Sequence, residues 1–300
     1  MPDVALTPDK RLTAPAPRSR LSQSWRSMRG SFQGMVGLTI VVVHLMIALT
    51  APLIAPYSPT DIDPSRRLEA PSEDHLFGTD TFGRDILSRV LYGGQVALLV
   101  AFAASVVAIT WGGLLGILLG YLGGRVDEVV MRVVDAVLAI PSLLLILLVV
   151  LALGSGFSVL VLTLGYTYGL TVVRVARGAT LAIVARDFIT AARARGERSR
   201  TIVLRELMPN VLDVLLVEYA MRSSWMLLAI ASLSFLGFGI SPPTPDWGRM
   251  VFENRGVLAV APWGTFFPVI AISSMVIGIN LAADALSKAV GLERTQEAPL

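Results

Sequence analysis

The sequence predicts an all-α membrane protein with six membrane-spanning helices. Of its 300 residues, 54% are hydrophobic and only 16% are charged, and the mean hydropathy is +0.68. A soluble domain of this length carries about 25% charged residues. The apolar residues gather in windows of roughly 20, the length at which a helix crosses a hydrocarbon core of about 30 Å. Helices are expected because lipid offers no hydrogen-bond partners to an exposed backbone.

Six apolar windows are the candidate spans. They cover roughly residues 34–55, 95–121, 131–152, 156–176, 211–236 and 264–286. In the third window Pro141 is expected to kink the helix, because proline lacks a backbone N–H. In the second, Gly112, Gly116 and Gly120 stand four residues apart, a spacing that permits another helix to approach closely. That helix could belong to the same chain or to a second copy.

The distribution of charge predicts the orientation. Residues 1–33 carry six Lys or Arg, and the apolar run behind them is longer than the core of a signal peptide, so it is expected to remain as the first span. Residues 174–209 carry eight Arg against three acidic residues, whereas residues 57–94 carry four Arg against seven. Because cytoplasmic loops are rich in Lys and Arg, the first of these loops and both termini are predicted inside.

Four parts of the chain follow from this topology. They are a cytoplasmic tail (1–33), the first span with its extracytoplasmic loop (34–94), a transmembrane core (95–290) and a cytoplasmic tail (291–300).

Two features are expected at the outer membrane surface. Apolar residues at helical spacing between Thr81 and Gly93 predict a short amphipathic helix lying on that surface. Trp247 and Trp263 are expected in the aromatic belt at the membrane interface.

The sequence lacks several motifs by which enzymes are recognised. The chain has no cysteine, no phosphate-binding G-x-x-x-x-G-K-[ST] loop and no H-E-x-x-H motif. His44 falls in a span and is expected to be a polar residue facing the bundle, and His75 falls in the outer loop. No catalytic, cofactor-binding or metal-binding residue is predicted. The net charge of +3 comes from loop residues that follow membrane topology, so no nucleic acid is expected as a partner.

Three ionisable residues fall inside the predicted spans. Glu218 and Arg222 stand four apart and are expected to form an ion pair on one helix face. Asp135 is predicted near the cytoplasmic start of the third span. Burying such groups in a membrane is costly, so each is expected to face the bundle and hold helices together. Direct contact with a transported solute is the alternative.

The segment Asp187–Asn210 does not resemble an ordinary connector. It reads D-F-I-T-A-A-R-A-R-G-E-R-S-R-T-I-V-L-R-E-L-M-P-N and has helix-forming composition on both sides of Gly196. Gly196 is expected to allow a turn between two short helices. Pro209 and Asn210 are expected to end the second helix before the fifth span begins. The segment is therefore predicted to be a helix–turn–helix that faces a partner.

This segment resembles the E-A-A-x-x-x-G-x9-I-x-L-P loop of ABC-importer permeases. Thr190 stands where that pattern has Glu, Glu206 where it has Ile, and Met208 where it has Leu. Three further stretches resemble the dipeptide, oligopeptide and nickel permeases. They are H-L-F-G-T-D-T-F-G-R-D-I-L-S-R (75–89), S-L-S-F-L-G-F-G-I-S-P-P-T-P-D-W-G-R-M (232–250) and N-L-A-A-D-A-L (280–286). Six spans with a long first outer loop are similar to the C-type permease of such systems.

The resemblance implies the fold of a type I ABC importer permease in a bacterial cell membrane, with a cytoplasmic coupling helix between spans 4 and 5. Its implied partners are a homologous second permease, two ATP-binding subunits and an extracytoplasmic substrate-binding protein, besides membrane lipid. ATP and Mg²⁺ would be bound by the ATPase subunits and by no residue here. The residues implied to couple to the ATPase are Thr190, Ala191, Ala192, Gly196, Glu206, Met208 and Pro209.

The resemblance also implies a cargo of di- or oligopeptides, without identifying the residues that bind it. A permease of the same architecture for nickel or another small solute is an alternative. A secondary transporter that does not use a nucleotide is a more distant one.

Overall fold

The computed structural model describes residues 30–290, and this part of the chain consists of helices and loops without a β-strand. An isolated bridge joins Thr79 and Asp85. Most of the predicted N-terminal tail and the whole C-terminal tail lie outside the described residues. The predicted all-α class is confirmed.

Within residues 30–290, five helical stretches are long and apolar enough to cross a membrane. They are α2 (Phe32–Ile54), α3 (Ile86–Leu122), α6 (Phe157–Val184), the run Ser199–Phe235 that ends in α9 (Met208–Phe235), and α11 (Trp263–Val290). Five of the six predicted windows fall within or largely within these stretches, so the prediction is confirmed for them.

The third predicted span is not one straight helix. Its window is divided between α4 (Gly124–Leu138) and α5 (Ser142–Leu153), whose axes are bent by 82°. Pro141 lies directly before α5 and cannot continue the hydrogen-bond ladder of α4, so the kink expected there is confirmed. The two helices are together long and apolar enough to form one broken span, so residues 30–290 hold five spans, or six if this pair is counted as one.

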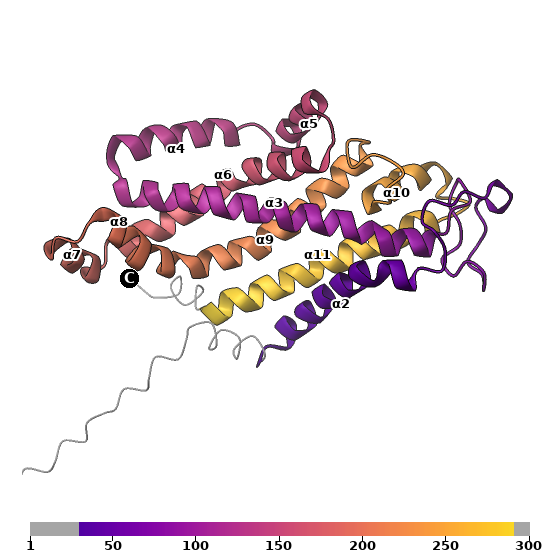
Figure 1. Ribbon diagram of the computed structural model, residues 1–300, viewed down its shortest axis with the longest axis horizontal. Helices are drawn as coiled ribbons and strands as arrows, with labels where there is room; N and C mark the ends of the chain where they lie inside the picture. The colour runs from indigo at the N-terminus through magenta and orange to yellow at the C-terminus, as the bar shows by residue number, and fades with distance from the viewer. Residues whose placement is uncertain (1–29, 291–300) are drawn as a thin grey trace, which may run out of the picture.

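The helices form an elongated bundle with two different ends (Figure 1). One end carries residues 55–85, with the short helix η1 (Pro64–Arg66), and α10 (Trp247–Asn254) with η3 (Arg255–Val257). We call it the loop end. The opposite end carries α7 (Asp187–Ala194), α8 (Ser199–Thr201) and the π-helical turn η2 (Ile202–Leu207). We call it the α7 end.

The glycine series of α3 packs against α6. A Cβ added at Gly112 would lie 2.4 Å from the Gly169 carbonyl oxygen, and one at Gly116 would lie 2.5 Å from that of Val173. A Cβ at Gly120 would meet the Thr180 side chain at 2.7 Å. The two backbones approach this closely only because the side chains are missing. The spacing thus serves packing within the chain, the first of the two expectations stated above.

Small and polar residues also join the remaining helices. Gly37 of α2 lies against Gly278 of α11, where an added Cβ would be 2.7 Å from the Gly278 carbonyl oxygen. His44 contacts Ser274 of α11 through Nε2 at 3.1 Å, which confirms that it faces the bundle. The Ser223 hydroxyl of α9 donates to Ser105 of α3 at 3.1 Å. Interhelical hydrogen bonds of this kind stabilise membrane bundles by about 1 kcal/mol or less each.

The amphipathic surface helix predicted over Thr81–Gly93 is absent. Helix α3 begins at Ile86, after the Asp85 carboxylate caps it by accepting the Ser88 N–H at 2.7 Å. Ile86 is fully buried, and so is most of Arg89. The prediction was wrong because the apolar face of this segment packs against protein instead of lipid.

Candidate functional site

The α7 end presents a short helix held between two long ones. Ile189 and Ala192 on one side of α7 are buried, at 0% and 1% exposure, in the same apolar cluster as Ile202 and Leu207 of η2. This anchoring leaves the opposite side of α7 exposed. The helix is therefore attached to the bundle along one face and open to a partner along the other.

Gly196 makes the turn that follows α7. Its φ is +74°, a left-handed conformation that glycine adopts without strain, and its N–H donates to the Arg193 carbonyl at 2.9 Å. The expected turn between two helices is confirmed.

Pro209 does not end the second helix, contrary to the prediction. The chain continues from α8 through η2 into α9, and Pro209 stands in the first turn of α9. The Met208 N–H donates to the Val203 carbonyl, a wider π-type bond that lets the helix pass a residue without an N–H. The Asn210 side chain donates to the Glu206 carbonyl at 2.6 Å.

The residues implied to couple to an ATPase fall into three groups by exposure. Thr190, Ala191, Gly196 and Pro209 are exposed, while Glu206 and Met208 are half-buried. Ala192 is buried against the chain's own helices, so its small size serves the attachment of α7.

Two further residues shape this end and were missed in the sequence. Phe188 is 39% exposed on α7, although it is a large apolar side chain. The Arg193 guanidinium lies 5.2 Å above the ring of Tyr121, at the end of α3. A cation over an aromatic ring contributes about 0.5–1 kcal/mol at exposed sites. The Arg193–Tyr121 contact therefore links α7 to α3. The apolar contacts of Ile189 and Ala192 separately link α7 to η2.

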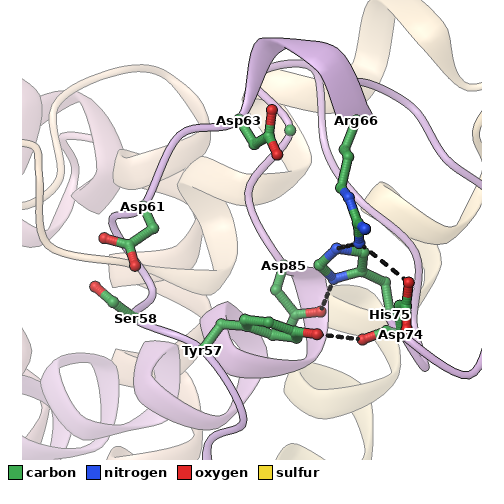
Figure 2. A pocket seen from close by; sticks show the side chains of 9 residues that line it. Tyr57, Ser58, Asp61, Asp63, Arg66, Asp74, His75 and Asp85 are labelled. Carbon is green, nitrogen blue, oxygen red and sulfur yellow. Dashed lines mark hydrogen bonds and ion pairs between the residues drawn. The ribbon is translucent and has the colours of Figure 1, made fainter.

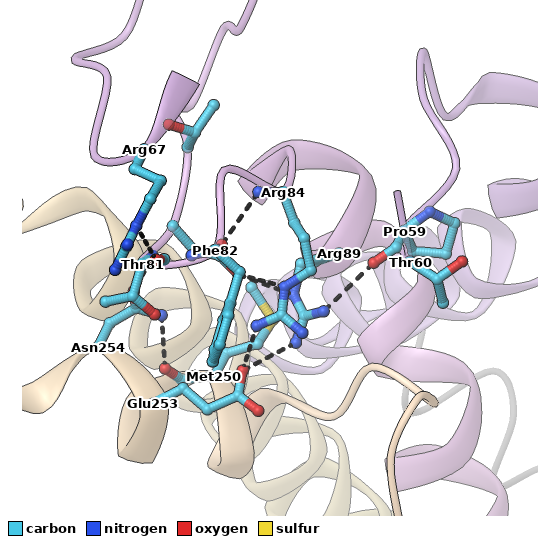
Figure 3. A network of polar contacts seen from close by, with 12 residues as sticks. Pro59, Thr60, Arg67, Thr81, Phe82, Arg84, Arg89, Met250, Glu253 and Asn254 are labelled. Atoms are coloured by element: carbon cyan, nitrogen blue, oxygen red, sulfur yellow. Dashed lines mark hydrogen bonds and ion pairs between the residues drawn. The ribbon is translucent and has the colours of Figure 1, made fainter. Parts of the chain in front are cut away.

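The loop end is held together by a network of buried charges (Figure 3). Arg84 and Arg89 both donate to Glu253 Oε2 of α10, at 2.5 and 3.2 Å, and Arg249 donates to its other oxygen at 3.0 Å. Asp80 accepts from Arg84 Nε at 2.7 Å. One glutamate on α10 thus accepts hydrogen bonds from guanidinium groups of the 55–85 loop, α3 and α10 itself.

Two carboxyl groups in and directly before α10 have shifted pKa values. Burial raises the pKa of Glu253, but the neighbouring Arg84 and Arg89 outweigh it, and the net pKa is lowered. Burial raises the pKa of Asp246 above its usual range, although the Arg249 and Gly248 N–H groups favour its charged form. Asp246 caps α10 by accepting the Arg249 N–H at 3.0 Å.

The two tryptophans of this end face inward. Trp247 is 4% exposed, fits against Gly93 and Gly94 of α3, and donates Nε1–H to the Val90 carbonyl at 2.8 Å. Trp263 donates to the Thr79 carbonyl at 3.1 Å. Their prediction as an interfacial belt was wrong, because both indoles join α10 and α11 to α3 and its preceding loop.

A cavity of about 410 Å³ opens in the 55–85 loop (Figure 2). It is lined by Tyr57, Ser58, Asp61, Asp63, Arg66, Asp74, His75, Gly83 and Asp85. The four carboxylates outnumber the one guanidinium. Among residues 30–290, however, no group of three or more His, Asp or Glu side chains could hold a metal ion.

The imidazole of His75 has a defined tautomer in this cavity. Arg66 Nη1 lies 3.1 Å from His75 Nε2 and can only donate, so Nε2 accepts. The proton is then on Nδ1, which donates to Asp85 Oδ1 at 2.9 Å. Because Asp85 also caps α3, His75 links the loop to the start of that helix.

Ion pairs also lie along the bundle. Arg222 Nε donates to Glu218 Oε2 at 2.9 Å, which confirms the expected pair. Arg177 of α6 binds Asp127 of α4 through two nitrogens. Asp135 pairs with Arg174 of α6 at 2.5 Å, but its side chain is 54% exposed, so it is not buried in the bundle as expected. Both pairs hold α4 against α6.

Comparison with known proteins adds two family matches. The model described as "binding-protein-dependent transport system inner membrane component" matches residues 112–292. The model described as "N-terminal TM domain of oligopeptide transport permease C" matches residues 19–71.

Three curated relatives cover nearly the whole chain. A dipeptide transport system permease protein of Alkalihalophilus pseudofirmus is 33% identical, over 94% of this chain and 92% of its own length. One of Haemophilus influenzae is also 33% identical, over 92% and 95%. A glutathione transport system permease protein of Shigella dysenteriae is 36% identical, over 91% and 90%.

Proposed function

Because the chain belongs to the family of binding-protein-dependent transport system inner membrane components, we propose that it is the permease subunit of an ATP-driven importer of short peptides. The names of its relatives, two for dipeptides and one for glutathione, support this class of cargo. Both cargoes are small peptides with a free carboxylate.

The α7 segment is the observation on which the coupling proposal rests. Its buried side is attached to η2 through Ile189 and Ala192, and its exposed side offers Phe188, Thr190 and Ala191. A force applied to the exposed side reaches α9 through η2, and α3 through the Arg193–Tyr121 contact. We propose that α7 is the coupling helix on which an ATPase subunit acts.

The proposed assembly contains other subunits. A homologous second permease completes the pathway, two ATPase subunits bind ATP and Mg²⁺ and dock at the α7 ends, and a binding protein delivers cargo at the loop end. The Arg-rich α7 end and both termini lie in the cytoplasm of a bacterial cell, with residues 95–290 as the transmembrane core. ATP binding draws the ATPase subunits together, and rotation of the bundles gives alternating access. This chain itself catalyses no reaction.

The turn at Gly196 provides the test. In Gly196→Val, a β-branched residue cannot adopt φ of +74° without strain, so α7 should lose its placement. ATP-driven peptide uptake by the reconstituted complex should fall to background while membrane insertion persists. Gly196→Asn is the control, because asparagine tolerates this conformation, and it should retain most of the uptake.

Two results would refute the proposal. Normal uptake by Gly196→Val would mean that the segment is only a connector. Uptake that persists after mutation of the nucleotide-binding lysines of the ATPase subunits would mean that transport does not use ATP.

A further inference from the structure

Within residues 30–290, the Glu218–Arg222 pair in the middle of α9 forms a hydrogen bond and ion pair only between its own two side chains. Arg222 lies about 20 Å from either end of the helix at 1.5 Å per residue, so it is at the depth of the hydrocarbon core. The Glu218 and Arg222 side chains are 11% and 17% exposed. Ionisable groups at such depth face protein or a water-filled cavity, because contact with lipid is costly.

Most of the hydrogen-bonding capacity of this pair is unused. Arg222 donates only Nε–H to Glu218 Oε2, and within residues 30–290 its Nη1 and Nη2 have no protein acceptor. Glu218 Oε1 likewise has no protein donor in that part of the chain. A guanidinium presents its N–H groups as a planar fork that fits the two oxygens of a carboxylate. Arg222 is thus partly exposed and available for a second anion.

The break between α4 and α5 lies at the same place. The Tyr168 hydroxyl, on the middle of α6, is within interaction range of both Ser142, the first residue of α5, and Arg222. Irregular backbone at membrane depth occurs where it is buried in protein or lines a water-filled cavity. Ser142 is exposed and is therefore not covered by the chain's own helices, as a residue lining such a cavity would be.

A groove leads from this point toward the loop end. It has a volume of about 370 Å³ and is lined mainly by apolar residues of α5, α9, α10 and α11. Two of its lining residues are close in sequence to Ser142 and the ion pair. Leu143 of α5 directly follows Ser142, and Leu228 of α9 comes six residues after Arg222. The groove thus begins on the same two helices, α5 and α9, that carry Ser142 and the ion pair, and it lies on their side toward the loop end.

We propose that Ser142, Tyr168, Glu218 and Arg222 line the solute pathway, and that Arg222 binds the carboxylate of a passing peptide. The free oxygen of Glu218 suits the peptide's ammonium group. This assignment rests on the proposed function for the chemistry of the cargo. An anionic lipid headgroup is a poor alternative, because Arg222 lies at the centre of its helix and not near an end.

Cysteine labelling tests the pathway without knowledge of the cargo. The chain has no native cysteine, so single cysteines can be introduced directly. In the complete complex in vesicles, a charged methanethiosulfonate reagent should label Ser142→Cys in at least one of the ATP-bound and nucleotide-free states. Leu144→Cys is the matched control, since Leu144 lies two residues further on α5 and is 53% exposed. Equal labelling of both, or no labelling of Ser142→Cys in either state, would overturn the pathway assignment.

Charge substitution tests the carboxylate site. Arg222→Gln should lower uptake of radiolabelled dialanine by at least about tenfold, because a hydrogen-bonded charge contact is lost. Arg222→Lys should recover only part of it, since lysine keeps the charge without the fork. The exchange Glu218→Arg with Arg222→Glu should restore the melting temperature of the complex but not its uptake.

The outcomes separate the two proposals. Wild-type uptake by the exchanged pair would overturn the carboxylate site, because the pair would then be needed only for packing. If the wild-type complex fails to import dialanine or glutathione, the proposed peptide cargo is wrong. In that case the labelling of Ser142→Cys still decides whether the pathway passes this point.

Discussion

Glu253 illustrates how one residue holds the loop end together. It is the shared acceptor of Arg84, Arg89 and Arg249, and it is only 13% exposed. Arg89 is more buried still, at 2% for its side chain, and its Nε has no hydrogen-bond partner. Removing the carboxylate would therefore leave three guanidinium groups close together, one of them almost inaccessible to water.

Glu253→Gln should destabilise the loop end by about 3 kcal/mol, because it leaves the buried Arg84 and Arg89 with Asp80 as their one remaining carboxylate. The apparent melting temperature in detergent measures this. Glu128→Gln is the control, since its pair with Arg132 on α4 is mostly exposed and should contribute less than about 1 kcal/mol.

The lowered pKa of the Glu253 carboxylate predicts how acid changes the stability of the loop end. Its pKa is lowered from 4.5 in the folded protein, so its stabilisation is complete at neutral pH and is lost as the pH falls through the lowered value. The stability difference between wild type and Glu253→Gln should thus shrink below pH 4.5. A difference that stays constant or grows on acidification would contradict this origin of the stability.

At the scale of elements, the α3–α6 pair is the central packing unit. Three glycines of α3 meet α6 in succession, and α3 also contacts α2, α9 and α11. Helix α6 leads directly into α7, and α9 comes after the α7 segment in the chain. The glycine contact between α3 and α6 therefore lies between the α7 end and the rest of the bundle, on the route proposed for coupling. Close backbone contact makes the two helices move together.

Gly116→Val should disrupt this unit. An added Cβ would lie 2.5 Å from the Val173 carbonyl oxygen and 2.7 Å from the Ala176 Cβ, so the helices must separate. A large drop in melting temperature or in the folded yield is expected. Gly178→Ala on α6 is the matched control, because nothing lies within 4 Å of its added Cβ and alanine favours the helix by about 1 kcal/mol. Equal stability of the two variants would show that the contact is looser than described.

At the scale of the whole molecule, the two ends differ in chemistry. The α7 end is rich in arginine around α7, whereas the loop end has an acidic cavity and a closed network of ion pairs. This asymmetry supports the proposed orientation, since Lys and Arg accumulate on the cytoplasmic side.

Labelling of single cysteines in intact spheroplasts tests the orientation. Glu73 and Ser199 are exposed residues at the loop end and the α7 end. An impermeant maleimide should label Glu73→Cys in intact spheroplasts and Ser199→Cys only after the membrane is permeabilised. The opposite pattern would reverse the proposed topology.

The sequence by itself determined the helices and most of their bounds. Apolarity over about 20 residues is a property of neighbouring residues, so five spans, the Gly196 turn and the Glu218–Arg222 pair could be predicted locally. The four motif stretches likewise identified the family. Pro141 predicted a kink but not its size, because the axis of α4 depends on its ion pairs with Arg174 and Arg177 of α6.

Only the tertiary structure decided which distant residues meet. Arg89 and Glu253 are 164 residues apart, and nothing in their neighbours indicates a shared site. The inward position of Trp247 and the approach of Ser142 to the middle of α6 also depend on contacts between helices that are distant in the sequence. The physical reason is that helix formation in a membrane follows from local hydrogen bonding and solvation, whereas pairing of side chains depends on how whole helices pack.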